Sequence, residues 1–209
     1  PVFAAYIFED GFESNDFSAW TATAHDGDMN VSVTSGDAYR GTYKAKFNGT
    51  NGNAKCYKTI TPINELWQRF YFRFVDTLPT STIYLAYFYY GQYNLLGRLQ
   101  YSFSTDKLMV ITYNGTSYVT YSESGTTIFD VDTWYCIEWH MKFNDTTGII
   151  QVWLDEVVKL DESNIDTYRG NDCNRVVQLF HVYSQSAERI IYYDCVVVDD
   201  EYIGEISEE

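Results

Sequence analysis

Hydrophobic and polar residues alternate with a period of two along most of the chain, which predicts strands rather than helices. The pattern is sharpest in Leu66–Phe74, where four apolar side chains and Gln68 share one face. Turn residues such as Asn114-Gly115 separate the alternating segments. The predicted strands are Pro1–Phe8, Val31–Val33, Thr42–Phe47, Lys55–Ile60, Leu66–Phe74, Ile83–Tyr90, Leu95–Ser104, Lys107–Tyr113, Tyr118–Ser122, Asp130–Phe143, Ile149–Leu154, Val157–Leu160, Val176–Tyr183 and Ile190–Val198.

Many short strands at regular spacing, with turn signals between them, predict an all-β sandwich of two antiparallel sheets. The 209 residues allow one large β domain, and no low-complexity linker or internal repeat divides them. We therefore expect a single domain over residues 1–209. The polar stretch Asp161–Asp172 is expected to be a crossing loop with room for a short helical turn.

The segment Ile7–Trp20 combines carboxylates and large rings. It holds Glu9, Asp10, Glu13 and Asp16 between four aromatic side chains. Rings that pin the loop to a core would let carboxylate and carbonyl oxygens converge on a cation. Calcium suits such a site because it takes several hard oxygen ligands. The alternative is an acidic, solvated turn without a metal.

The charge of the chain narrows the range of partners. It has 14 basic and 29 acidic residues, for a net charge of −15. A surface this negative repels phosphates and anionic headgroups, so neither nucleic acid nor membrane insertion is expected. Calcium, neutral glycans and other protein surfaces stay open as partners. Negative charge also simply keeps a protein soluble.

Four cysteines and four glycosylation sequons favour an extracellular or cell-surface location. No two cysteines form a C-x-x-C pair, which argues against zinc, and their even number allows two disulfides in any of three pairings. No signal-peptide pattern precedes the first strand, so any leader is expected to have been removed. The residues are Cys56, Cys136, Cys173 and Cys195, and Asn30, Asn48, Asn114 and Asn144.

Three parts of the chain together carry a resemblance to a known group. They are Asp10–Ser14 with Trp20 and Arg40–Tyr43, then Thr133–Tyr135 with Glu138, Asp145–Gly148 and Val152–Asp155, and finally Tyr193–Asp199 with Tyr202–Gly204. In this order they resemble the concanavalin A-like lectin/glucanase superfamily, which includes laminin-G domains. The resemblance implies an antiparallel jelly-roll sandwich over nearly the whole chain. It implies little about activity, because this fold hosts lectins, glycosidases, polysaccharide lyases and structural modules.

The resemblance also implies a metal site. In related jelly rolls an acidic N-terminal loop beside the last strand often holds a structural calcium. Carried over to this chain, Glu13 and Asp194 are the expected side-chain ligands, with Asp10 in reserve and backbone carbonyls from the loop and from around Gly41. Hard oxygen ligands make calcium the expected cation. Its expected role is to lock the two ends of the sandwich together.

The second face of Leu66–Phe74 alternates aromatic and basic side chains. Such a face can bind sugars, because aromatic rings stack on them, although it is also common on the wet side of a sheet. One face of the strand Val176–Tyr183 adds a histidine and a tyrosine. The candidate glycan-binding residues are Trp67, Arg69, Tyr71, Arg73, His181 and Tyr183.

Catalytic residues are not expected. Glycosidases of this fold use paired carboxylates on one strand, but here Glu138 stands alone. Lyases need a cation to neutralise a uronate and a tyrosine or histidine to move protons. The spacing from Gln178 to His181 departs from the Q-x-H pattern of such lyases, and nothing in the sequence joins His181 to Arg69 or Arg73.

The expected function is therefore that of a non-catalytic extracellular structural protein. It would be the subunit of a surface filament, coat or layer, and would associate with itself or with other surface proteins. A glycan-binding module is the alternative, and a polysaccharide lyase or glycoside hydrolase is the second alternative. Large polymers in solution would favour the structural subunit. Retention on a polysaccharide column would favour the glycan-binding module, and depolymerisation of uronate polymers would favour a lyase.

Overall fold

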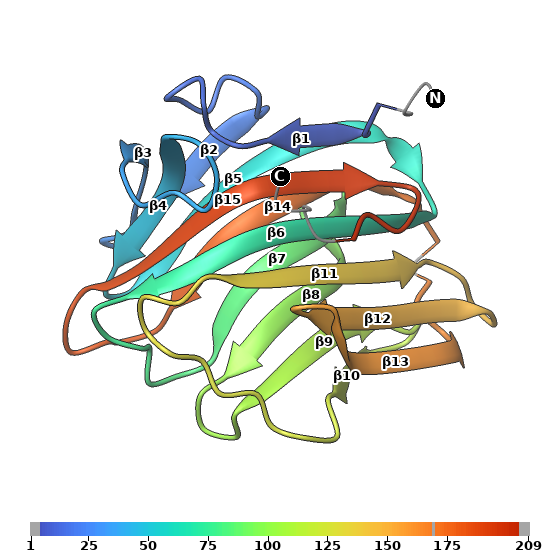
Figure 1. Cartoon of the computed structure of the whole chain (residues 1–209). Coiled ribbons are helices and arrows are strands. Elements are labelled where there is room, and N and C mark those ends of the chain that lie inside the picture. The colour runs from blue at the N-terminus through green and yellow to red at the C-terminus, as the bar shows by residue number, and fades with distance from the viewer. Residues whose placement is uncertain (1–4, 169, 205–209) are drawn as a thin grey trace.

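The computed structural model describes residues 5–168 and 170–204, which form two antiparallel sheets packed face to face (Figure 1). Sheet A has the order β13-β12-β11-β6-β15-β4-β3, with β1 also paired to β15, and sheet B has the order β10-β9-β8-β7-β14-β5-β2. The strands are β1 (Phe8–Asp10), β2 (Ala22–His25), β3 (Asn30–Ser35), β4 (Tyr43–Gly49), β5 (Gly52–Ile63), β6 (Glu65–Val75), β7 (Ile83–Tyr90), β8 (Asn94–Ser102), β9 (Lys107–Tyr113), β10 (Tyr118–Ser122), β11 (Tyr135–Lys142), β12 (Gly148–Leu154), β13 (Val157–Ile165), β14 (Cys173–Val182) and β15 (Arg189–Asp199).

The predicted all-β sandwich is confirmed, and its architecture is that of a concanavalin A-like jelly roll. Strands β7, β9 and β10 have the bounds that the alternating pattern predicts. Between residues 5–168 and 170–204 the chain forms no helix, and therefore none that is long and apolar enough to cross a membrane.

Three short stretches differ from the prediction. One is residues 130–134, which were predicted as strand but precede β11 and form none. β2 was not predicted, because its four residues Ala22–His25 lie at the edge of sheet B and none is buried. β13 continues to Ile165, so the first part of the predicted crossing loop is a strand. It is also an edge strand, and edge strands commonly carry polar and charged side chains. The predicted strand Pro1–Phe8 lies partly outside the described residues, and β1 begins at Phe8.

The core lies between the two sheets. On β6 the predicted inner face is fully buried, with Phe70, Phe72 and Phe74 all at 0% exposure. Gln68 shares that face and donates its amide to Gln178 of sheet B at 3.1 Å. Trp139 of sheet A donates its indole N–H to the Gln68 oxygen at 3.1 Å. These bonds satisfy polar groups that would otherwise destabilise the core.

The two ends of the described chain meet in sheet A. β1 pairs with the second half of β15, and β4 pairs with its first half. In the following loop Phe12 and Trp20 are buried, as expected, and stack with centroids 6.2 Å apart, while Phe17 is partly buried. Asp10 accepts hydrogen bonds from the Phe12 backbone at 2.8 Å and the Trp20 indole at 2.7 Å. The loop is thus braced from within by the carboxylate of Asp10.

The prediction of two disulfides is wrong for this structure. All four cysteines lie in the described part of the chain, and no disulfide joins any of them. Cys56 and Cys173 face the core on neighbouring strands, but Cys56 pairs with Gln178, several residues away from Cys173. Cys136 and Cys195 lie on β11 and β15, and β6 runs between these strands. An extracellular location therefore loses the support of disulfides.

Candidate active site

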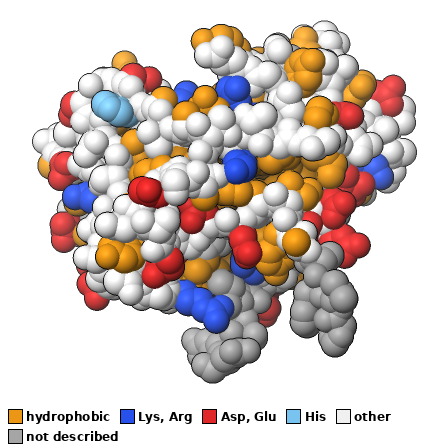
Figure 2. Space-filling view, turned by 90° about the horizontal axis from the view of Figure 1, so that it is seen from above, with side chains coloured by type: hydrophobic (Ala, Val, Ile, Leu, Met, Phe, Trp, Pro, Cys, Tyr) orange, Lys and Arg blue, Asp and Glu red, His pale blue; other side chains and the backbone are white. Residues whose placement is uncertain are grey.

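The two sheets differ in charge. The seven strands of sheet B contain no aspartate or glutamate, whereas several strands of sheet A do. Acidic side chains are scattered over the face seen from above, on the side of β1 (Figure 2). The outward face of sheet B carries Lys55, Arg98 and Arg175, and none of these forms a salt bridge with another described residue. This face is therefore suited to an anionic ligand in spite of the net charge.

A row of polar side chains crosses four neighbouring strands of this face. Pairing sets Gln100 of β8 beside Tyr84 of β7, Tyr84 beside His181 of β14, and His181 beside Asn53 of β5. The rings of Tyr84 and His181 stack with centroids 4.5 Å apart and planes 11° apart. The Arg98 guanidinium lies over the Tyr84 ring, 4.1 Å from its centroid. A base, a phenol and a cation are thus held within one small cluster.

Hydrogen bonds around His181 indicate which ring nitrogen carries the proton. Asn53 Nδ2 donates to both carboxylate oxygens of Asp26, at 3.2 and 2.9 Å, so Asn53 Oδ1 is left as an acceptor. His181 Nδ1 lies 3.0 Å from that oxygen and therefore donates to it. The lone pair is then on Nε2, which is the requirement for a general base.

Burial lowers the pKa of His181. The Asp26 carboxylate and the Gly52 carbonyl act in the opposite direction, and the nearby Arg98 adds to the lowering. The imidazole is therefore neutral at neutral pH. Burial raises the pKa of Tyr87, which follows Tyr84 by three residues on β7 and packs against it. This phenol therefore stays protonated and can donate a hydrogen bond.

Gln100 lies at the end of the row and is 6% exposed. Its Oε1 makes no hydrogen bond to any described residue, and such a buried acceptor calls for a partner from a ligand or water. Gln178, three positions before His181, has its side chain in the core, where it donates to the Leu85 carbonyl at 2.9 Å. The glutamine of this site therefore comes from β8 rather than from the histidine strand.

The six predicted glycan-binding residues are divided between the two sheets. Four of them lie on the outer face of β6 in sheet A. His181 belongs to β14 in sheet B, and Tyr183 follows that strand with 67% exposure. Only His181 takes part in the polar row described above.

On sheet A, the four β6 side chains are engaged by their neighbours. Trp67 stacks on the His140 ring with centroids 3.7 Å apart. Tyr71 stacks on Tyr39 at 3.6 Å. Arg73 lies 5.3 Å from the centroids of two aromatic rings. Contacts of this kind are typical of a packed outer face, and each buries part of the surface that a sugar would need. Arg69 completes the group and donates to the Gly204 carbonyl.

The predicted metal ligands Glu13 and Asp194 hold one turn from two sides. Glu13 Oε1 accepts from the backbone of Thr42 at 2.9 Å and of Tyr43 at 2.8 Å. Asp194 Oδ2 accepts from the Arg40 backbone at 3.1 Å. Burial raises the pKa of Asp194 to about 6 in spite of these hydrogen bonds. A buried carboxylate of this kind is stabilised by a nearby cation.

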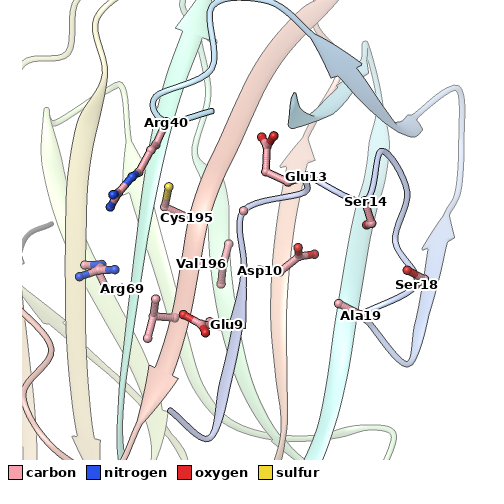
Figure 3. A pocket seen from close by; sticks show the side chains of 12 residues that line it. Glu9, Asp10, Glu13, Ser14, Ser18, Ala19, Arg40, Arg69, Cys195 and Val196 are labelled. Atoms are coloured by element: carbon pink, nitrogen blue, oxygen red, sulfur yellow. The ribbon is translucent and has the colours of Figure 1, made fainter. Parts of the chain in front are cut away.

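A cavity of about 520 Å³ lies beside this turn (Figure 3). Carboxylates of the N-terminal loop lie on one side, and Arg40 and Arg69 lie on the other, with Cys195 between. Among the described residues, no group of three or more His, Cys, Asp or Glu side chains gathers to hold a metal. The oxygens of Asp10 are already bonded within the loop, so a cation here would depend on Glu13, Asp194 and backbone carbonyls.

No protein-family model matches the chain, and no curated protein matches its sequence. In structure it is similar to an endo-β-1,4-glucuronan lyase from the fungus Trichoderma reesei, with a TM-score of 0.75, 16% identity, and coverage of 94% of this chain and 96% of that chain. It is also similar to the cellulose-induced protein Cip1, with a TM-score of 0.71, 15% identity, and coverage of 94% and 99%. An alginate lyase, Aly36B, in complex with an alginate trisaccharide matches with a TM-score of 0.52, 12% identity, and coverage of 93% and 98%. At these identities the likeness shows the fold.

The expected non-catalytic structural role is wrong. The similar structures include two polysaccharide lyases, which favours the lyase alternative over a filament or coat subunit. Five residues of the site were not predicted from the sequence, although one signal was present. Residues 77–105 contain no acidic residue, in a chain that has 29 of them. The five residues are Asp26, Asn53, Tyr84, Arg98 and Gln100.

Proposed function

We propose that the chain is a polysaccharide lyase that cleaves a uronate-containing polymer by β-elimination. The observation that carries this proposal is the cluster of His181, Tyr84 and Arg98 on a sheet whose strands contain no acidic residue. Unpaired cations there can bind an anionic sugar. A glycoside hydrolase would need two carboxylates on this face, and its strands supply none. The fold shared with two lyases is consistent with this choice.

Each step of the elimination has a group that suits it. Arg98 binds the uronate carboxylate and stabilises the charge that develops when the neighbouring C5 proton leaves. His181 Nε2 accepts that proton. The electron pair forms a C4–C5 double bond as the C4–O4 bond breaks, and the Tyr84 hydroxyl donates a proton to the departing oxygen. Atoms and charges balance without any further reactant.

Asp26 and Asn53 have positioning roles. They do not contact the sugar in this scheme, but their hydrogen bonds hold the imidazole in the tautomer that exposes the Nε2 lone pair. The hydrogen bonds that link Asp26, Asn53 and His181 also keep the imidazole ring from rotating. The stacked Tyr84 ring restrains it from the other side.

The test is the ultraviolet absorbance of the unsaturated product. The protein is incubated with polyglucuronate, alginate and polygalacturonate, and at least one should yield the absorbance of a C4–C5 double bond conjugated to a carboxylate. We expect His181→Ala to lower kcat by about 100-fold or more, because general bases contribute at least that much. The control is His25→Ala, which removes a histidine from the edge strand β2 of the same sheet. New reducing ends without absorbance would indicate hydrolysis, and no cleavage of any polyuronate would overturn the proposal.

We also propose a structural calcium held by Glu13, Asp194 and backbone carbonyls of the turn between them. Gly41 supports this, because its φ is +79° and a Cβ there would lie 2.5 Å from Glu13 Oε1. No side chain is therefore tolerated in the space beside the carboxylate. The donors are hard oxygens, which calcium prefers. When bound, calcium would compensate the charge of two carboxylates, and it has no part in the elimination.

We propose an extracellular location, where polyuronates are found as matrix polymers. The sequons support it by their placement. Asn30 is exposed, and Asn114 and Asn144 lie in turns whose backbone N–H groups they cap. Asn48 differs from the other three in lying within β4, where it is half-buried and donates to Glu188 at 2.6 Å.

A further inference from the structure

A second cavity, of about 300 Å³, opens on sheet B near the polar row. Its lining includes Lys55 and Arg175 with the rings of Tyr57, Tyr89 and Tyr93, and no aspartate or glutamate. The larger cavity beside β1 is different in kind, because several carboxylates line it. Charge and aromatic content thus make the smaller cavity the one suited to an acidic sugar.

The Arg175 side chain is oriented by an aromatic ring and is not paired with a described carboxylate. Its guanidinium lies over the Tyr57 ring, 4.4 Å from the centroid, which orients its plane. It forms no salt bridge to a described residue, and its Nε makes no hydrogen bond within the described chain. A planar guanidinium that no described carboxylate occupies can pair with the two oxygens of a ligand carboxylate. Its charge is therefore available to a carboxylate on the ligand.

Strands β5 and β14 contribute to both the cavity and the polar row. Lys55 is two positions from Asn53 on the same face of β5. Arg175 is six positions from His181 on β14, which is roughly 20 Å at the rise of a strand. One sugar ring cannot reach both residues, but several linked rings can. Tyr93, which is 80% exposed, stands at the rim as a platform for a ring.

We propose that this cavity is a second anion subsite, where Arg175 binds the carboxylate of a uronate several sugars away from the cleaved bond. Lys55 lies between the two positions and suits an intervening carboxylate. This inference rests on the proposed lyase function and adds a substrate class to it. The substrate is a continuous polyuronate, in which every residue is charged, and long chains bind better than short ones.

The test compares Arg175→Gln with wild type on polyglucuronate and on its trisaccharide. For the polymer we expect KM to rise about tenfold, as for loss of a charge-assisted hydrogen bond, while kcat stays within about twofold. For the trisaccharide, which is too short to reach Arg175 from the cleaved bond, neither constant changes. Arg175→Lys should recover part of the lost affinity. The control Lys46→Gln removes the same charge from sheet A and should leave both constants unchanged.

A binding measurement separates this inference from the lyase proposal. Affinity electrophoresis in polyglucuronate, and in the same polymer with its carboxyl groups reduced, reports binding without turnover. If wild type binds the charged polymer and Arg175→Gln binds it less well, the subsite stands even if no polymer is cleaved. If wild type cleaves but Arg175→Gln matches it in KM and affinity, the lyase stands and the subsite is overturned. Failure of wild type to prefer the charged polymer also overturns it.

Discussion

The imidazole of His181 is held by a chain of hydrogen bonds that begins at an exposed loop. Asp26 accepts from the backbone and the side chain of Asn53, and Asn53 accepts from His181. These hydrogen bonds decide which ring nitrogen carries the lone pair, while burial keeps the ring neutral. A histidine in this setting needs no metal and no neighbouring charge on its own strand to act as a base.

We predict that Asp26→Asn shifts the acid limb of the pH profile of kcat/KM to lower pH. The Asp26 carboxylate raises the pKa of His181, so removing its charge lowers that pKa further. The base then stays deprotonated to a lower pH. The same change weakens the orientation of Asn53, and we expect kcat to fall about tenfold.

The control for this experiment is Asp28→Asn in the same loop. Asp28 accepts from the backbone of Thr50 and Asn51, so it supports the loop without facing the imidazole. Its substitution should leave the acid limb in place. An unchanged limb in Asp26→Asn, with kcat also unchanged, would contradict a positioning role for Asp26.

At the scale of single strands, the alternating pattern was a reliable guide wherever a strand has one buried face. β9 and β12 show this, because buried and partly exposed residues alternate along both of them. Two of the edge strands were harder to predict, although a third, β10, has the predicted bounds. β2 and the end of β13 bury little, so their sequences lack the hydrophobic alternation that marks a strand.

The site could not be predicted in the same way. Alternation shows which residues share a face, but not which strands lie side by side. His181 and Asn53 are 128 positions apart and meet only because β14 lies between β5 and β7. His181 was among the residues predicted from the sequence, whereas Tyr84 was not. Arg98 and Asn53 gained a role only once the strand order brought them to the same place.

At the junction of β1 and β15 we predict that calcium stabilises the fold. Chelation should lower the Tm of the wild-type protein, because Glu13 and Asp194 then repel each other across the turn that both of them hold. Glu13→Ala should remove the sensitivity to chelator and lower the Tm on its own account. A melting curve that is indifferent to chelator would leave a turn held by hydrogen bonds alone.

At the scale of the whole molecule, two electrostatic effects act on a polyanion. The net charge of −15 repels it at long range, whereas Lys55, Arg98 and Arg175 attract it at contact. From the total charge alone, anionic partners were expected to be repelled, while calcium, neutral glycans and other protein surfaces stayed open. The segregation of acidic residues away from the strands of sheet B reverses that expectation locally.

We predict that the KM for polyuronate passes through a minimum as salt is raised. The screening length is about 30 Å at 0.01 M and about 10 Å at 0.1 M, so the first additions of salt remove mainly the long-range repulsion. Higher salt then weakens the contacts with the three cations, and KM rises. Activity measured from low to high ionic strength tests this. A KM that only rises from the lowest salt would show that the net charge has no influence on binding.

The strand order also bears on the making of the protein. β14 lies between β5 and β7 in sheet B, and β15 lies between β4 and β6 in sheet A, yet these two strands follow all the others along the chain. When the ribosome has released residues 1–172, each sheet therefore consists of two separate parts. The strand edges that will later pair with β14 and β15 are still unpaired. Chains of this kind expose unpaired strands until late in synthesis, when they are prone to aggregate. Slow elongation before residue 173, or a missing chaperone, should therefore cost this protein more yield than it would cost a sandwich whose central strands are made first.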